Sequence, residues 1–372
     1  MNVERPLRLA QAVLGLDRIV YAHYAVTHRC CLRCRSCAIW KRGDADAELS
    51  LDQIRELTRV LARLGCLQIS LSGGEPTLRA DLPEIVRAFQ AAGIRTRVLT
   101  NGVDLTAELI DRLLAAGLRD VSFSLNSLRP DLQENLDDAG HTFERRIANL
   151  LALAERLPKN RTLPLLNTVV TPHNLDELER LVEFAERIGF YLSFIPVHLA
   201  RDGDADHPAY GSDNDLRFTQ ESEAQVRATY QRLIEHKRRG APILNSTAFL
   251  RRSADYLLGA NAAWPCRAGR FYVSVAPDGR IGACHAFEGM RDVRYDEFAG
   301  KYADPSWRRE FIRAPENCEG CLRPCWAEVS FMLTDARSLW EMARLQTRAW
   351  WPRRRVDVAA VRDWLRRSPG VA

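Results

Sequence analysis

Apolar positions along residues 21–197 change repeatedly between two periods, which predicts strands alternating with helices. Short apolar runs precede longer segments in which apolar residues recur every three or four positions, the spacing of one helix face. The expected strands are 21–26, 67–71, 95–99, 120–125, 163–170 and 191–197. The expected helices are 50–64, 82–92, 107–116, 143–157 and 175–188. Strands that alternate with helices of this length favour a parallel sheet, so the predicted fold class is α/β.

Three cysteines follow the first expected strand at a spacing typical of cluster ligands. Cys30, Cys34 and Cys37 are separated by three and then two residues. Soft thiolates select iron–sulfur clusters or zinc, and three of them would leave the fourth iron of a four-iron cluster open for chemistry. The alternative is a zinc knuckle, which needs a fourth ligand. Cys31 cannot easily supply it, because adjacent side chains of an extended chain point in opposite directions.

A second motif, Gly73-Gly74-Glu75-Pro76, follows the second expected strand. Glycines have no Cβ, so they allow the backbone to turn sharply and to approach a ligand closely. A Gly-Gly pair alone is more often an ordinary turn. Its position downstream of the three cysteines makes it a candidate binding segment.

Together, these two motifs resemble the radical S-adenosylmethionine (radical SAM) superfamily. The resemblance implies a partial (β/α)6 TIM-like barrel, a 4Fe-4S cluster on the three cysteines, and S-adenosylmethionine bound to the open iron. Cleavage of this cofactor would give a 5′-deoxyadenosyl radical. One position departs from the family pattern, since Ser36 stands where an aromatic or bulky residue usually precedes the third cysteine. Trp40 or another side chain is therefore expected to cover the adenine.

Active sites of such barrels lie at the carboxyl ends of the parallel strands, and the resemblance places further cofactor contacts there. The expected cofactor-binding residues are Gly73, Gly74, Glu75, Pro76, Asn101, Ser124, Asn126 and Thr168. Each has an ordinary structural alternative, such as a turn or a cap. The loop at residues 137–141 lacks the arginine that family members often carry after the fourth strand, so another basic residue is expected to bind the carboxylate.

Five further cysteines form a second group near the C-terminus: Cys266, Cys284, Cys318, Cys321 and Cys325. Asp278-Gly279 predicts the turn of a β-hairpin between the first two. The arrangement resembles the auxiliary-cluster extensions called SPASM and twitch domains, and five cysteines favour the shorter twitch type with one additional 4Fe-4S cluster. The preferred ligands are the first four, with Cys325 competing for the last position. Structural zinc is the alternative.

The chain has 372 residues, ten of them cysteines, with no apolar stretch of membrane-spanning length and no pattern of a secretory signal. Cysteines in motif spacings then indicate metal ligands in a reducing cytoplasm and not a disulfide framework. The expected domains are an amphipathic segment (1–20), the barrel (21–220), a linker helix with the auxiliary-cluster domain (221–347), and a basic C-terminal helix (348–372).

The net charge of +5 is concentrated in residues 348–372, which hold seven arginines and two aspartates. Trp350, Trp351 and Trp364 accompany these arginines. The preferred interpretation is a terminal helix that docks its apolar face and leaves its arginines in solvent. Peripheral contact with an anionic membrane is the alternative, and nucleic acid is an unlikely partner.

The sequence therefore predicts an enzyme that abstracts hydrogen from a substrate, preferably a ribosomally made peptide. Carbohydrates and lipids are the alternative substrates. A non-catalytic iron–sulfur or zinc-binding interaction protein is the alternative of another class. The family resemblance implies a flavodoxin or ferredoxin as reductant.

Overall fold

The computed structural model describes residues 18–42, 48–200, 211–260, 264–284, 293–314, 318, 320–351 and 355–367. Six parallel strands lie side by side in chain order. They are β1 (Tyr21–Thr27), β2 (Gln68–Gly73), β3 (Arg95–Thr100), β4 (Asp120–Ser124), β5 (Leu165–Val170) and β6 (Tyr191–Pro196). The predicted α/β fold class and its six strands are confirmed.

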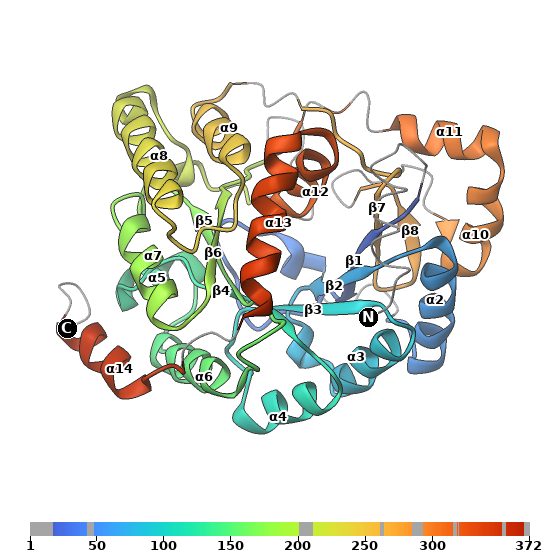
Figure 1. Cartoon of the computed structure of the whole chain (residues 1–372), viewed down its shortest axis with the longest axis horizontal. Coiled ribbons are helices and arrows are strands. Elements are labelled where there is room, and N and C mark those ends of the chain that lie inside the picture. The colour runs from blue at the N-terminus through green and yellow to red at the C-terminus, as the bar shows by residue number, and fades with distance from the viewer. Residues whose placement is uncertain are drawn as a thin grey trace.

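Helices follow the strands and cover the outer face of the curved sheet (Figure 1). They are α2 (Leu51–Leu64), α3 (Leu82–Ala91), α4 (Ala107–Ala115), α6 (Phe143–Arg156) and α7 (Leu178–Arg187). An additional helix, α5 (Pro130–Asp137), follows β4 and was not predicted. It is short, begins at a proline and ends at Asp138 in the left-handed conformation, so its apolar pattern covers too few turns to be recognised.

Local sequence signals define the ends of α2. Ser50 and Gln53 form the predicted capping box, with the Gln53 side chain accepting from the Ser50 N–H at 2.9 Å. Gly65 ends the helix with φ of 95°, a conformation that glycine adopts without strain. Between these ends, Ile54, Leu57 and Leu61 are fully buried in the core, and each such burial contributes about 1.5–3 kcal/mol.

The inner, concave face of the sheet is more polar than its helix-covered face. His23 on β1 lies beside Ser70 on β2, which lies beside Arg97 on β3. Arg97 donates to the Ser122 hydroxyl at 3.2 Å. Because side chains alternate between the two faces of a strand, these polar groups share the interior of the partial barrel.

The C-terminal extension continues the same sheet. Strand β7 (Tyr272–Val275) pairs in parallel with β1, and antiparallel strands β8 (Arg280–Gly282) and β9 (Val293–Arg294) follow. Gly279, in the turn of the predicted hairpin, has φ of +83°. The remaining helices are α8 (Glu223–Arg238), α9 (Thr247–Leu257), α10 (Tyr295–Ala303), α11 (Pro305–Arg313), α12 (Pro324–Thr334) and α13 (Ala336–Trp350).

Helices α12 and α13 lie on the concave face of the sheet (Figure 1). The Trp326 ring of α12 stacks on Tyr272 at 4.5 Å between centroids and contacts Tyr21 edge-on at 6.0 Å. Leu345 of α13 packs with Leu165 and Tyr191, near the beginnings of β5 and β6. The extension therefore fills part of the barrel interior and places its cysteines beside the first strand.

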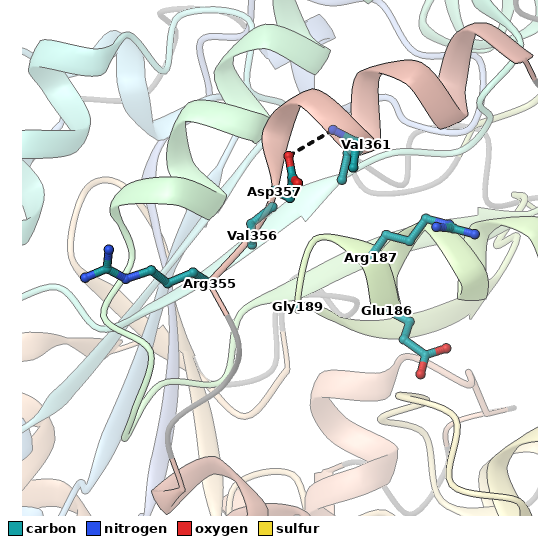
Figure 2. A pocket seen from close by; sticks show the side chains of 8 residues that line it. Glu186, Arg187, Gly189, Arg355, Val356, Asp357 and Val361 are labelled. Atoms are coloured by element: carbon teal, nitrogen blue, oxygen red, sulfur yellow. Dashed lines mark hydrogen bonds between the residues drawn. The ribbon is translucent and has the colours of Figure 1, made fainter.

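The last helix, α14 (Val358–Arg367), packs against α7. The Trp364 ring stacks on Phe184 with 6.1 Å between centroids, and its Nε1 donates to Glu183 at 3.1 Å. Val361 and Leu365 are buried, so α14 docks through its apolar face, whereas Arg348 of the expected terminal helix belongs to the end of α13. Figure 2 shows the cavity of about 450 Å³ that remains between the start of α14 and the end of α7.

Most of the expected N-terminal amphipathic segment (1–20) lies outside the described residues. None of the helices in the described part of the chain combines the length and apolar character needed to cross a bilayer.

Candidate active site

The three motif cysteines lie on the loop that connects β1 to a short 3-10 helix, Ile39–Arg42. The Cys37 N–H donates to the Cys34 carbonyl at 3.0 Å, which closes a turn within the motif. Cys30, Cys34 and Cys37 are all partly exposed. Burial nevertheless raises the pKa of the Cys34 and Cys37 thiols, so the thiolate forms of both residues are costly. Coordination to a metal offsets this cost.

Arg35, between the second and third cysteines, fixes the loop to two other segments. Its guanidinium donates to Asp213 at 2.6 Å, to Asp215 at 2.7 Å and to the Asn135 side chain at 2.6 Å. Asn135 belongs to α5, whereas Asp213 caps the 3-10 helix Asn214–Leu216 that follows β6 and Asp215 lies within that helix. The hydrogen bonds from Arg35 hold the pKa of the Asp213 carboxyl below its usual value. The loop is therefore anchored by charge-assisted hydrogen bonds.

The Gly-Gly-Glu segment leaves β2 directly against the cysteine loop. A Cβ at Gly73 would lie 2.0 Å from the Thr27 carbonyl oxygen, and one at Gly74 would lie 2.1 Å from that of Arg29. Gly73 also has φ of +124°. Sequence reasoning ascribed these glycines to a sharp turn and to the approach of a ligand. The structure adds a further requirement, since the backbone before the first cysteine fills the space that a Cβ at either position would need. Their role in cofactor binding stays a prediction.

Glu75 is fully buried and joins the ends of β2 and β3. Its carboxylate accepts from the Asn101 N–H at 2.7 Å, the Thr100 hydroxyl at 2.8 Å and the Thr77 hydroxyl at 2.7 Å. Desolvation raises the pKa of Glu75, although these hydrogen bonds oppose the shift. Pro76 is also buried and begins the 3-10 helix Pro76–Leu78.

Asn101 and Ser124, the predicted contacts at the ends of β3 and β4, lie at the same edge as the cysteine loop. The Asn101 side chain donates to the Cys31 sulfur at 3.3 Å, and its oxygen accepts from the Val103 N–H at 2.9 Å. Ser124 is partly exposed. The structure brings both residues near the motif, and their role in cofactor binding stays a prediction.

Asn126 and Thr168 use their side chains within the sheet. The Asn126 side chain accepts from the Val169 N–H at 2.9 Å, and the Thr168 hydroxyl donates to the Leu125 carbonyl at 2.7 Å. Both residues are buried. These bonds connect β4 to β5, which is the ordinary structural alternative for such residues, and direct contact with a cofactor stays a prediction.

Arg146 is the basic residue at this end of the barrel that sequence reasoning missed. It comes from α6, is almost fully buried, and is paired with Asp137 at the end of α5. Its Nε donates to the Asn101 carbonyl at 2.7 Å and its Nη2 to the Ser124 carbonyl at 2.6 Å. The available signal was a charged residue on the apolar face of a predicted helix, next to Phe143 and Ile147.

The second cysteine group gathers beside β7 and the start of α12. Cys284 and Cys321 are buried in one cluster with Trp326, and Cys266 packs against it. The Cys266 sulfur lies 3.0 Å from the Tyr272 hydroxyl. Among the described residues, no three His, Cys, Asp or Glu side chains converge closely enough for a single metal ion. A cluster needs a wider spacing, since its thiolates bind different irons.

Cys325 differs from the other members of this group in its electrostatic surroundings. Burial raises the pKa of Cys321 to about 12, the Arg323 backbone N–H and guanidinium lower it, and Cys266 and Cys318 add smaller upward shifts. Burial likewise raises the pKa of Cys325 to about 11 and the Arg323 guanidinium lowers it, but no other described cysteine shifts the pKa of Cys325. Cys325 packs against the same cluster as Cys266, so the preferred ligand set of Cys266, Cys284, Cys318 and Cys321, with Cys325 as the competitor, stays a prediction.

Comparisons with known proteins agree with this geometry. A family model described as Radical SAM superfamily matches residues 24–185. The chain is 32% identical to a PqqA peptide cyclase of Ruegeria pomeroyi over 315 residues, which cover 80% of this chain and 78% of the relative. It is 28% identical to a PqqA peptide cyclase of Xanthomonas campestris over 308 residues, which cover 80% of this chain and 77% of that relative.

Solved structures of similar fold include Streptococcus suis SuiB bound to S-adenosylmethionine, with a TM-score of 0.60 and 16% identity over 82% of this chain and 71% of that chain. The structure of SuiB bound to its precursor peptide SuiA has a TM-score of 0.60 and 18% identity. The match covers 83% of this chain and 72% of that chain. At this level of identity, the likeness concerns the fold alone.

Proposed function

We propose that this chain, which belongs to the radical S-adenosylmethionine superfamily, modifies a ribosomally made peptide at a carbon–hydrogen bond. The observation that carries the proposal is the 32% identity, over 80% of the chain, to a protein named PqqA peptide cyclase. The cysteine loop and the Gly-Gly-Glu segment both fall within the matched family model at residues 24–185. The chain is accordingly a radical SAM enzyme, and the peptide substrate is the proposed part.

The residues at the carboxyl ends of the strands fit the cofactors of this family. Cys30, Cys34 and Cys37 offer three thiols on one anchored loop, a donor set that suits a 4Fe-4S cluster with one open iron. When bound and reduced, the cluster supplies the electron that cleaves S-adenosylmethionine, whose 5′-deoxyadenosyl group then takes hydrogen from the substrate. Asn101 and the Gly-Gly-Glu backbone would orient the methionine part of the cofactor.

Arg146 would contribute positive charge where the cofactor carboxylate is expected. Its pairing with Asp137 and its bonds to two carbonyl oxygens fix the guanidinium at the strand ends. A buried arginine held in this way positions neighbouring groups without having to reorganise. Arg146, with its charge balanced by Asp137, is therefore our candidate for the basic residue that the loop at 137–141 lacks.

The second cysteine group would hold an auxiliary 4Fe-4S cluster on Cys266, Cys284, Cys318 and Cys321. Its place beside β1 and β7 is next to the barrel interior, where a peptide side chain would enter. Such a cluster would accept the electron that a product radical releases when it is oxidised. A flavodoxin or ferredoxin as electron source, and a reducing cytoplasm as the setting, are parts of the same proposal.

A lipid substrate loses the support of α14, the described helix of the basic tail, because this helix packs against α7. No feature of the described residues favours a carbohydrate over a peptide. The peptide proposal can be tested with short peptides encoded beside the gene, synthesised with deuterium at candidate carbons. Incubation with reconstituted enzyme, S-adenosylmethionine and dithionite should change the peptide mass and transfer deuterium into 5′-deoxyadenosine.

The variant in which Cys30, Cys34 and Cys37 are all replaced by Ala is the control and should give neither signal. Deuterium transfer from a sugar or lipid, with none from any such peptide, would contradict the proposed substrate class.

A further inference from the structure

We propose that Arg33, Trp40 and Lys41 form a docking surface for an acidic one-electron donor protein. This donor surface rests on the proposed function, since only a reductive cleavage requires an electron from outside. For each S-adenosylmethionine cleaved, the donor loses one electron. That electron would reach the sulfonium through the cluster, and cleavage of the carbon–sulfur bond would give methionine and the 5′-deoxyadenosyl radical.

The first support is positive charge that no carboxylate among the described residues pairs with. Residues 28–42 contain five basic residues and no acidic residue. Arg29 is paired with Glu48, and Arg35 with Asp213 and Asp215. Arg33 and Lys41 are exposed. In the described part of the chain, no carboxylate lies within ion-pair distance of Arg33 or Lys41.

The second support is the composition of the donor surface. The Arg33 guanidinium carbon lies 5.1 Å from the centroid of the Trp40 ring, and the Lys41 amino nitrogen lies 5.7 Å from it. Tryptophan and arginine are enriched in the interfaces of protein complexes. Two exposed cations on one aromatic ring fit a partner of negative charge, because complementary charge accelerates encounter and orients the partner.

The third support is the direct connection of the donor surface to the motif cysteines. Trp40 Nε1 donates to the Cys37 carbonyl at 2.9 Å. Arg33 Nη1 donates to the Cys30 carbonyl at 3.0 Å. One side chain, Arg33 or Trp40, would thus separate a donor on this surface from the backbone of Cys30 or Cys37. The path for an electron to the motif is therefore short.

A similar pair elsewhere on the molecule supplies a matched control. On α13, the Arg344 guanidinium lies 5.5 Å from the centroid of the Trp340 ring, and Trp340 is 59% exposed. This helix packs through Leu345 against the beginnings of β5 and β6, at the opposite ends of the strands from the motif. A donor docked there would not be near Cys30 or Cys37.

The test compares two reductants for the same reaction. For Lys41→Glu, the KM for reduced flavodoxin in 5′-deoxyadenosine formation should rise about threefold to tenfold at low salt, with kcat unchanged. Added salt should reduce the difference from wild type, because it screens exposed charges. The rate with dithionite should stay unchanged, and Arg344→Glu should match wild type with both reductants.

Iron content shows whether the variant is loaded like wild type, and Lys41→Gln provides a milder change if Lys41→Glu does not fold. An equal loss with flavodoxin and dithionite would overturn the proposal, because the effect would then lie in the cluster. An unchanged flavodoxin KM in both Lys41 variants would also overturn it. Wild-type enzyme that forms no 5′-deoxyadenosine with dithionite would instead contradict the proposed function on which the donor surface depends.

Discussion

The backbone N–H of Glu75 donates to the carbonyl oxygen of Arg29 at 2.8 Å, which joins the Gly-Gly-Glu segment to the residue before the first motif cysteine. The Gly74 N–H makes a matching bond to Thr27, also 2.8 Å long. The two motifs that are separated in sequence are therefore one structural unit. A change in either should affect the other.

The glycine at position 74 provides the first test of this unit. Gly74→Ala would place a methyl group 2.1 Å from the Arg29 carbonyl oxygen, so the cysteine loop must move. We expect a loss of about 1–3 kcal/mol in unfolding free energy and, after reconstitution, loss of about half of the iron. Iron analysis and thermal unfolding measure both effects.

Gly300→Ala is the matched control, because a Cβ there meets no atom within 4 Å. Gly300 lies within α10, where alanine favours the helix by about 1 kcal/mol. Full iron content in Gly74→Ala, with stability like that of Gly300→Ala, would refute the close packing of the two motifs.

The auxiliary ligand set provides a second prediction. In a background with Cys30, Cys34 and Cys37 replaced by Ala, about four irons should remain per reconstituted chain. Adding Cys318→Ala should remove most of these irons, whereas adding Cys325→Ala should leave them. Iron and sulfide analysis with electron paramagnetic resonance distinguishes the two variants. Stoichiometric zinc in place of the remaining irons would contradict the auxiliary-cluster assignment.

Glu328 on α12 gives a third prediction, on the pH dependence of stability. Its buried carboxyl accepts from the Ser246 N–H at 2.9 Å. Desolvation raises the pKa of Glu328 from 4.5 to about 7. Between about pH 4.5 and 7 the folded chain therefore keeps a proton on the Glu328 carboxyl that the unfolded chain has released. The contribution of Glu328 to the unfolding free energy is lost as pH rises through this window.

Glu328→Gln should remove this dependence, because the amide keeps an acceptor for Ser246 but cannot ionise. The unfolding free energy of wild type should fall relative to the variant by about 3 kcal/mol across this window. Denaturant unfolding at a series of pH values measures it. If the unfolding free energies of the two proteins change with pH in parallel, Glu328 ionises in the folded chain as it does in the unfolded chain.

The docked tail gives a fourth prediction with an internal control. Trp364→Ala should lower the unfolding free energy by about 1–3 kcal/mol, because the indole stacks on Phe184 and packs against the core cluster that contains Val361 and Leu365. Trp351→Ala should have little effect, since Trp351 is 75% exposed. Formation of 5′-deoxyadenosine should be unchanged in both variants.

Unchanged stability in Trp364→Ala, together with salt-sensitive binding of wild type to anionic liposomes, would favour a membrane role for the tail.

The barrel could be predicted from sequence because local and tertiary preferences agree there. In α2, the Ser50 cap, the apolar face and Gly65 all indicate the same helix. Helix α12 could not be predicted in this way. Trp326 faces the barrel interior while Phe331 packs with Phe249 of α9, so apolar residues occur on several sides of the helix and no single face repeats.

The candidate site was predictable only where chemistry determines the residue type. The spacing of the motif cysteines identified their loop, and the hairpin turn at Gly279 placed Cys266 and Cys284 on either side of it. For Arg146 the only signal was a charge on the apolar face of a predicted helix. Its contacts could not be predicted from that signal, because its partners Asp137 and Ser124 come from other elements and meet only in the folded barrel.

The central claim is that Cys30, Cys34 and Cys37 support reductive cleavage of S-adenosylmethionine. The most direct measurement is 5′-deoxyadenosine formed by the anaerobically reconstituted enzyme with S-adenosylmethionine and dithionite, quantified by liquid chromatography. Wild type should form it slowly even without substrate, and the variant with all three cysteines replaced by Ala should form none. Equal amounts from both proteins, or none from wild type with full iron content, would contradict the account.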